Sequence, residues 1–293
     1  MRNRARDGFE RLTRWPTHKI CARGLLLFPF LLALSAASVR PALAGPPFRT
    51  DDPQPVDFRH WEAYVFSTFD KTADGRATQF PALEFNWGAV PNVQIHLIVP
   101  AASSRPPGGP TWFGAGDVEF GVKYRFIQEG GARPQIGIFP QLELPTGNVD
   151  RGLGNGGVWA RLPLWVQKSW GPWTTYGGGG YVINRAPGMR SHALAGWLLQ
   201  RDLGKRLTLG GEVYSEGRSS IMIRSSTVVD LGGYYNFSRN FSLLFSAGRE
   251  FIGGAAPAAF RGRDLPAGRA MKSKDLHGSY WHRSTSTIRY AIA

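Results

Sequence analysis

Apolar and polar residues alternate along most of this chain with a period of two. In the clearest stretch, Gly116 to Gln128, apolar residues occupy every second position, namely Val118, Phe120, Val122, Tyr124 and Phe126. The positions between them are charged, or glycine: Asp117, Glu119, Gly121, Lys123 and Arg125. Successive side chains of a strand point to opposite faces. The pattern therefore predicts a strand with one fully apolar face and one fully polar face.

The same alternation predicts eleven strands in all. They begin near His60, Ala77, Val93, Gly116, Pro134, Gly157, Trp173, His192, Leu207, Ser226 and Phe241. Most run for about 8 to 14 residues, which is longer than ordinary soluble strands and close to the length of a strand that crosses a membrane. The fold class that follows is all-β, an antiparallel up-and-down transmembrane barrel of about twelve strands.

The connections between these strands alternate in length. Short turns are expected at 88–92, 129–133, 169–172, 203–206 and 237–240, and longer links at 70–76, 100–115, 146–156, 185–191 and 215–225. This threading is typical of outer-membrane barrels. Aromatic residues flank the short turns, as in an interfacial girdle: Trp87, Phe126, Trp170, Trp173, Phe237 and Phe241. The alternative is a soluble antiparallel sandwich, whose strands also alternate.

The first 44 residues have the three parts of a secretory signal peptide. Seven basic residues precede the apolar run Gly24 to Ala37, and the sequence Ala42-Leu43-Ala44 supplies a cleavage site before Gly45. The apolar run is too short to span a bilayer as a helix. We therefore predict Sec-type export and an outer-membrane location in a Gram-negative cell. The predicted divisions are a signal peptide (1–44), a periplasmic N-terminal segment (45–59), the barrel (60–253) and a basic irregular tail (254–293).

The net charge of +14 in 293 residues could indicate nucleic-acid binding, but its distribution argues against it. Cleavage after Ala44 leaves 27 basic against 19 acidic residues, and the tail from 254 onward holds seven of these basic residues against two acidic ones. The barrel body keeps 20 against 17. We therefore expect no nucleic-acid partner. The single cysteine, Cys21, excludes disulfide frameworks and sites built from several thiolates.

Four stretches resemble a known family of outer-membrane barrels. They are GPPFRTDDPQPVDFRHWE (45–62), DVEFGVKYRF (117–126), PQLELPTGN (140–148) and SWGPWTTYGGGGY (169–181). Members of that family are described as transporters or as relatives of a phenol meta-pathway (MetA) protein. The resemblance covers most of residues 45 to 250. It implies a barrel of roughly twelve strands and supplies no catalytic signature to carry over.

The C-terminal end departs from what the resemblance implies, since such barrels usually close with a twelfth strand ending in an aromatic residue. Here the sequence after Gly254 is basic and rich in proline and glycine. Ile288, Tyr290 and Ile292 offer a weak alternating remnant. Either this remnant closes the barrel, or the tail is a divergent end and closure is compromised. An open edge in hydrocarbon would leave unpaired backbone groups at several kcal/mol each.

The polar faces of the predicted strands hold the candidate functional residues. Ten charged residues would point into the lumen if the apolar faces meet lipid: Glu62, Glu84, Asp117, Glu119, Lys123, Arg125, Glu143, Arg161, Glu212 and Asp230. These residues either line a passage that orients and selects solutes or pair with one another in a sealed interior. Residues 152–157 (GLGNGG) lead into a strand rather than a helix, so they favour a loop over a dinucleotide site.

These observations favour a passive, cofactor-free channel or transporter for small solutes, with no catalytic, cofactor-binding or metal-binding residues. The idea of hydrophobic or aromatic solutes rests on the resemblance alone. The expected partners are outer-membrane lipid, a small-molecule solute and, during biogenesis, the barrel-assembly machinery. Two alternatives remain: a barrel hydrolase acting on lipid or peptide, and a structural or adhesive barrel. An inward histidine within reach of a serine or aspartate at the rim would favour the hydrolase, and a continuous inner void would favour transport.

Overall fold

A computed structural model describes residues 47–72, 75–221, 224–238, 240–252 and 286–292. The predicted signal peptide (1–44) and residues 254–285 of the predicted tail lie outside the described residues. The predicted barrel (60–253) corresponds closely to the run of strands that begins at Trp61 and reaches Ile252.

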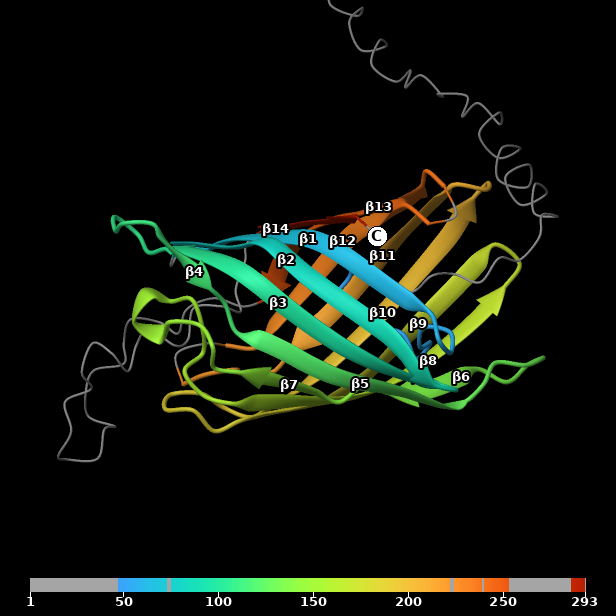
Figure 1. The fold of residues 1–293 in the computed structure, drawn as a ribbon, viewed down its shortest axis with the longest axis horizontal. Helices are drawn as coiled ribbons and strands as arrows, with labels where there is room; N and C mark the ends of the chain where they lie inside the picture. Colours follow the sequence, from blue (N-terminus) through green and yellow to red (C-terminus); the bar gives the residue numbers. More distant parts are fainter. Residues whose placement is uncertain (1–46, 73–74, 222–223, 239, 253–285, 293) are drawn as a thin grey trace, which may run out of the picture. The chain divides into compact units, whose positions relative to one another are not determined.

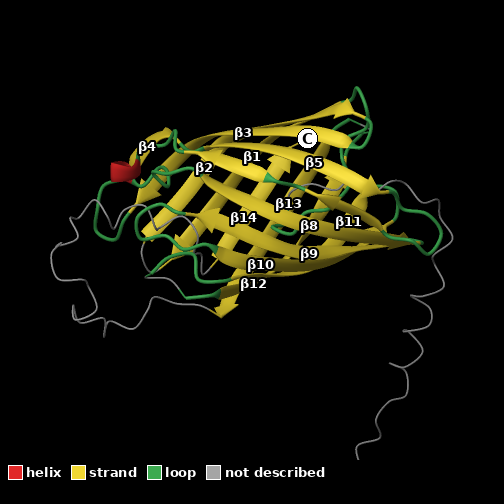
Figure 2. Cartoon of the chain, turned by 90° about the horizontal axis from the view of Figure 1, so that it is seen from below, coloured by secondary structure: helices red, strands yellow, loops and turns green. Residues whose placement is uncertain are grey.

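The described residues form one antiparallel sheet (Figures 1 and 2). Its strands are β1 (Trp61–Thr72), β2 (Gly75–Val90), β3 (Val93–Arg105), β4 (Trp112–Ala115), β5 (Val118–Ile127), β6 (Gln135–Ile138), β7 (Gln141–Leu144), β8 (Trp159–Trp170), β9 (Trp173–Asn184), β10 (His192–Leu203), β11 (Leu207–Glu216), β12 (Ser226–Asn236), β13 (Ser242–Ile252) and β14 (Ser286–Ile292). A single 3₁₀ turn, η1 (Val149–Arg151), lies at the end of the barrel where β4 is found (Figure 2).

Fourteen strand segments in the described chain make twelve passages of the barrel wall, as predicted. β4 and β5 both pair with β3, and β6 and β7 both pair with β5 and with β8, so each couple is one interrupted strand. One interruption falls at Phe139-Pro140, where proline cannot donate to the ladder. The wall stays hydrogen-bonded there because Phe139 N donates to Pro163 O at 3.2 Å and Val122 N donates to Pro140 O at 3.0 Å.

The strand β14 closes the barrel. It pairs with β13 on one side, from Leu243 opposite Ile292, and with β1 on the other, from Val65 opposite Ile292. Of the two alternatives for the C-terminal end, the structure shows the closing strand, at the position of the weak alternating remnant. Closure leaves no free sheet edge along this seam, which a barrel in hydrocarbon requires.

Burial is inverted relative to a soluble protein. Large apolar side chains lie exposed on the outside of the barrel, Trp197 at 54% and Leu231 at 70%, while charged side chains lie inside it, Lys123 at 3% and Glu212 at 1%. A soluble sandwich would bury its apolar face between two sheets. The inversion shows that lipid, not a second sheet, covers the apolar face. No helix within the described residues is long and apolar enough to cross a membrane.

The connections differ from the prediction at the first hairpin. Residues 70–76 were expected to form a longer link, but β1 continues to Thr72 and β2 starts at Gly75, so two residues join them. Lys71 pairs with Arg76 in this extended hairpin. The link at 100–115 was also expected to be a loop, and it is mostly a hairpin of β3 and β4. The remaining longer links, 145–158, 185–191 and 217–225, lie at the same end, which we call the long-loop end.

The other end of the barrel, the short-turn end, has the turns 91–92, 128–134, 171–172, 204–206 and 237–241. Exposed aromatic residues lie beside these turns, including Trp87, Phe126, Trp170, Phe237 and Phe241 of the predicted girdle. Trp61 stacks on Trp87 with ring centroids 5.3 Å apart. Trp173, the remaining member, is half-buried, and the Arg201 guanidinium lies 5.0 Å from its ring centroid.

Deletion of residues 286–293 should prevent assembly of the barrel. It exposes the facing edges of β1 and β13, whose unpaired backbone groups cost several kcal/mol each in hydrocarbon. We expect the shortened chain to lose the gel-mobility difference between boiled and unboiled samples. Replacing Ser286 alone by alanine is the matched control and should preserve that difference. A shortened chain that still migrates faster unboiled would show that β14 does not close the wall.

Candidate functional site

Residues 47–58, the N-terminal segment, lie against the inner face of the barrel. The backbone amides of Arg49 and Thr50 each donate to the Glu212 carboxylate at 2.7 Å. Ser246 Oγ donates to Pro47 O at 2.7 Å, and Val56 N donates to Gln94 Oε1 at 2.9 Å. The segment therefore contacts β13 and β11 at one end and β3 at the other, across the lumen. The described part of the predicted periplasmic segment is thus in contact with the lumen wall.

The wall accommodates this segment through glycines. A Cβ at Gly196 of β10 would collide with Thr50 Oγ1, and a Cβ at Gly88 of β2 would collide with Asp57 O. Gly88 also accepts a hydrogen bond from Arg59 N at 2.8 Å and donates one to His60 O at 3.1 Å. Glycine at these two positions lets the backbone of the segment approach the strands closely.

Lys123 of β5 is the cation that holds the segment's acidic residues. Its Nζ donates to Asp51 Oδ1 at 2.9 Å and lies 3.7 Å from Asp52 Oδ2. The same ammonium group lies 4.9 Å from the centroid of the Phe139 ring. Lys123 and Asp52 are buried, and burial raises the pKa of the Asp52 carboxyl from 3.8 to about 7 despite the nearby ammonium. This contact joins two parts of the sequence 71 and 72 residues apart.

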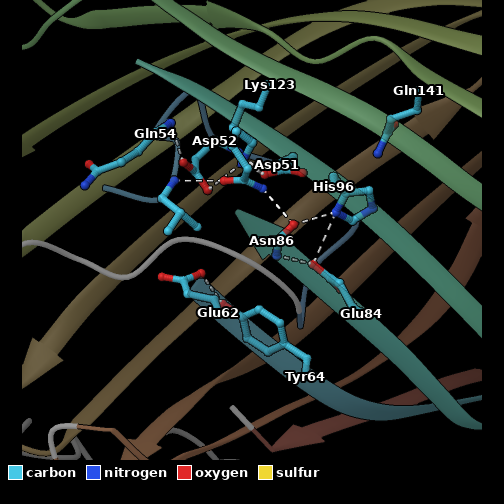
Figure 3. Close-up of polar contacts among 12 residues, drawn as sticks. Asp51, Asp52, Gln54, Glu62, Tyr64, Glu84, Asn86, His96, Lys123 and Gln141 are labelled. Carbon is cyan, nitrogen blue, oxygen red and sulfur yellow. Dashed lines mark hydrogen bonds and ion pairs between the residues drawn. The ribbon is translucent and has the colours of Figure 1, made fainter. Parts of the chain in front are cut away.

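A chain of polar side chains continues from the segment along the wall (Figure 3). Gln94 Nε2 donates to Asn86 Oδ1 at 2.8 Å, and Asn86 Nδ2 donates to Glu84 Oε1 at 2.8 Å. His96 contacts Asn86 Oδ1 through Nδ1 at 2.7 Å and Glu119 Oε1 through Nε2 at 3.1 Å. Both ring nitrogens therefore face oxygen acceptors, which suits a ring that carries both protons.

The same chain of contacts reaches β8. Gln141 Nε2 donates to Glu119 Oε1 at 3.0 Å, and Arg161 Nη1 donates to Gln141 Oε1 at 3.4 Å. The inner wall from β2 to β8 is therefore one connected polar surface. Networks of this kind hold buried polar groups in fixed positions because each member is satisfied by its neighbours.

A cavity of about 280 Å³ adjoins this surface. The N-terminal segment contributes residues 47–51 to its lining, and the loop after β7 contributes Leu153, Gly154 and Asn155. Asp117 anchors that loop, since it accepts hydrogen bonds from Gly147 N at 2.8 Å and Asn155 N at 2.6 Å. The strand positions in the lining, such as Asp70, Gln79 and Glu216, place the cavity toward the long-loop end.

The cavity lining is acidic overall, with aromatic faces. Seven carboxylates contribute to it against two guanidinium groups, an excess of five negative charges if His96 is neutral and four if it is charged. The acidic residues are Asp51, Asp70, Glu84, Asp117, Glu119, Glu143 and Glu216, and the basic ones are Arg49 and Arg161. Phe48, Phe66, Phe139 and Tyr214 also line it.

The structure distributes the ten predicted lumen residues over three places. Glu84, Asp117, Glu119, Glu143 and Arg161 line the cavity. Lys123 and Glu212 bind the N-terminal segment, and Asp230 lies opposite Glu212 in the register of β11 and β12. Glu62 accepts a hydrogen bond from Tyr64 Oη at 2.8 Å, and Arg125 donates to Gln135 Oε1 at 3.1 Å and to Asn92 Oδ1 at 3.0 Å. These last two do not line the cavity.

Several residues of this arrangement were not among the sequence-based candidates, notably Asp51, Asp52, Asn86 and Gln141. The uncharged ones sit on the polar faces of predicted strands, so alternation gave their side but not their partners. The adjacent acidic pair Asp51-Asp52 precedes the first strand and has no periodicity. A signal was present in the sequence, since Lys123 is the one lysine of a strand whose polar face otherwise carries acids, glycine and an arginine.

The described histidines contact carbonyl, amide and carboxylate oxygens. His60 Nδ1 lies 3.1 Å from Phe58 O and His192 Nδ1 lies 3.0 Å from Arg190 O. Within the part of the chain that the structure describes, no histidine is hydrogen-bonded to a serine, and no group of three His, Cys, Asp or Glu residues could hold a metal ion.

Comparison with known proteins places the sequence and the fold. Residues 65–259 match the family described as "Putative MetA-pathway of phenol degradation". The fold is similar to the crystal structure of an outer-membrane channel from Pseudomonas putida F1, with a TM-score of 0.62 and 13% sequence identity. The similarity covers 87% of this chain and 98% of that channel. No match was found among curated proteins.

Replacing Lys123 by methionine should release the N-terminal segment from the wall. The substitution leaves Asp51 and Asp52 without their cation, and removing one partner of a buried ion pair costs about 3–5 kcal/mol. We expect faster tryptic cleavage after Arg49 in the folded barrel. Lys168→Met is the control, because Lys168 makes an equally short contact with Glu129, 2.9 Å, at the partly exposed rim. Equal cleavage rates in the two variants would contradict the role assigned to Lys123.

Docking of the N-terminal segment should weaken as the pH rises. Because the pKa of Asp52 is about 7 when docked and near 3.8 when free, the docked state binds the extra proton. The docking constant should fall between pH 4 and pH 7, by at most about tenfold per unit, and level off above pH 7. The tryptic cleavage rate after Arg49, corrected for trypsin's own pH profile, should rise accordingly. Asp52→Asn should abolish this dependence, and an unchanged profile in that variant would assign it to another group.

Proposed function

We propose that this chain, which belongs to the family described as "Putative MetA-pathway of phenol degradation", conducts small solutes through the outer membrane. The observation that carries the proposal is the connected polar inner wall with its cavity of about 280 Å³. A purely structural barrel of this width could fill its interior with side chains instead. The likeness to an outer-membrane channel supports the same fold and location.

The chemistry of the cavity supports small aromatic solutes of neutral or positive charge. Its volume lies just below the usual range for pockets of drug-sized ligands, so it suits a single-ring molecule. Phe48, Phe66, Phe139 and Tyr214 offer aromatic faces. The excess of carboxylates raises the local concentration of cations and lowers that of anions. Transport of this kind is passive and requires no cofactor.

The N-terminal segment sets the width of the passage in this proposal. It contacts β3, β5, β11 and β13 from within, so a solute must pass beside it or displace it. The cavity lies where the segment and the loop at 153–155 both contribute to the lining. Selection therefore occurs at the level of Asp51 and Glu119, in the interior of the barrel.

The alternative of a barrel hydrolase has less support. The inward histidine, His96, is hydrogen-bonded to an amide and a carboxylate of the wall network rather than to a nucleophile. General acid–base catalysis with a serine requires the two side chains within hydrogen-bond reach. The contacts of His96 favour a role in holding the polar wall.

Liposome swelling across matched solutes tests the proposal. We expect benzylamine and benzyl alcohol to enter liposomes that contain the full chain several-fold faster than benzoate, because all three have one ring and differ in charge. The double variant Glu119→Gln/Glu143→Gln should reduce the preference for benzylamine. The control Glu62→Gln, which lies outside the cavity, should leave it unchanged. Swelling no faster than in protein-free liposomes for every solute would refute the channel.

A further inference from the structure

Two arginines and a lysine meet on the outer surface of the barrel at the long-loop end. Lys71 of β1 lies directly opposite Arg76 of β2, and Arg76 lies directly opposite Arg105 of β3. All three side chains are exposed. Directly opposed residues have Cβ atoms about 4.5–5.5 Å apart, and like charges in such positions destabilise a sheet. We call these residues the cationic row.

The row faces outward because β2 contains a bulge. Between Ala82 and Gln79 the strand has one residue more than its neighbours on both sides, β1 and β3. Below the bulge, Ala82 and Glu84 face the lumen, and above it Gln79 faces the lumen and lines the cavity. Arg76, three residues from Gln79, is therefore on the opposite face. Lys71 and Arg105 are likewise out of phase with the inward residues Asp70 and Ala102 of their strands.

The guanidinium groups of this row lack an internal counter-charge. Within the described chain, neither Arg76 nor Arg105 makes an ion pair or a side-chain hydrogen bond. The turn beside them contributes one acid, Asp74, which lies outside the described residues. Even with that charge included, the row keeps a net charge of +2. The loops of the same end are basic too, with Arg185, Arg190, Arg218 and Arg224 exposed.

Directly beneath the row the outer surface becomes apolar and aromatic. The next outward positions in register are Phe69, Thr78, Ser103 and Phe113 on β1 to β4. Phe113 is 71% exposed, and Phe80 at the bulge is 62% exposed. The surface thus offers charge at the rim and aromatic rings toward the bilayer. That order matches an anionic lipid headgroup above its acyl chains.

We propose that the cationic row binds a phosphate group of a phosphorylated lipid in the outer leaflet of the outer membrane. Outer-membrane barrels carry their longer loops on the outside, which places the row at that leaflet. Two neighbouring guanidinium groups bind a phosphate with short, charge-assisted hydrogen bonds. Lys71 adds a third positive charge, and the rings of Phe69 and Phe113 contact the chains. The bound phosphate offsets the repulsion that the register imposes. This site is outside the lumen and does not depend on the proposed transport.

The test compares lipid binding by the full chain and by a rim variant. The probe is the lipid A part of lipopolysaccharide with two phosphates, titrated onto detergent-solubilised protein. Each cation near a membrane surface contributes about a fivefold change in affinity. Arg76→Gln/Arg105→Gln should therefore weaken binding by about 25-fold. The matched control, Lys205→Gln/Arg206→Gln, removes two adjacent exposed cations from a short turn at the other end. It should bind lipid A as the unchanged chain does.

Three further arms keep the result decisive. Dephosphorylated lipid A should bind both proteins equally weakly, and inorganic phosphate should compete only at much higher concentration. Without lipid, the double variant should melt at the same or a higher temperature than the parent, since it relieves like-charge repulsion. A variant that melts earlier and also binds lipid as tightly as the parent, or any variant that binds equally well, overturns the proposal. Preference for free phosphate over the lipid overturns it as well.

Discussion

The whole structure depends on one constraint, that backbone groups in hydrocarbon must be hydrogen-bonded within the protein. The seam between β1 and β13 meets this constraint through the seven residues of β14. The wall meets it again where its strands are interrupted. At Phe139-Pro140, the main-chain bonds to Pro163 and from Val122 maintain the connection although proline has no amide hydrogen. Closure thus tolerates local irregularity, provided that both neighbours of each strand stay paired.

Closure also decides where charge can go. Lipid covers the outer face, so charged residues of the spanning strands face the lumen, where water, other side chains and the N-terminal segment satisfy them. Acids outnumber bases there, and the cations present have specific partners. Lys123 binds Asp51 and Asp52, and His96 lies between Glu84 and Glu119. The N-terminal segment supplies further donors, since the amides of Arg49 and Thr50 bind Glu212. The segment therefore acts as part of the electrostatic balance of the lumen.

Alternation in the sequence was enough to predict the strands, their faces and the number of passages, because a period of two is the direct signature of a sheet between lipid and water. It could not predict features without a period. Residues 47–58 contain Pro53 and Pro55 and no alternation, so nothing local indicated that they enter the lumen. The partners of Lys123 come from a segment more than 70 residues away. The identity of the closing strand was left open, since residues 286–292 alternate over a shorter length than their neighbours.

The bulge in β2 shows how one residue can determine two surfaces. If β2 kept a strict period of two from Glu84 upward, Arg76 would face the lumen and Gln79 would face lipid. The extra residue at Phe80-Pro81 reverses both positions. It removes a cation from the acidic cavity, whose excess of carboxylates is thereby kept, and it places that cation beside Lys71 and Arg105 on the outer rim. The charge preference of the lumen and the cationic row outside it are two consequences of the same register shift. Removing one of the two bulge residues should therefore alter ion preference and lipid binding together, whereas substitutions at the rim alter only the second.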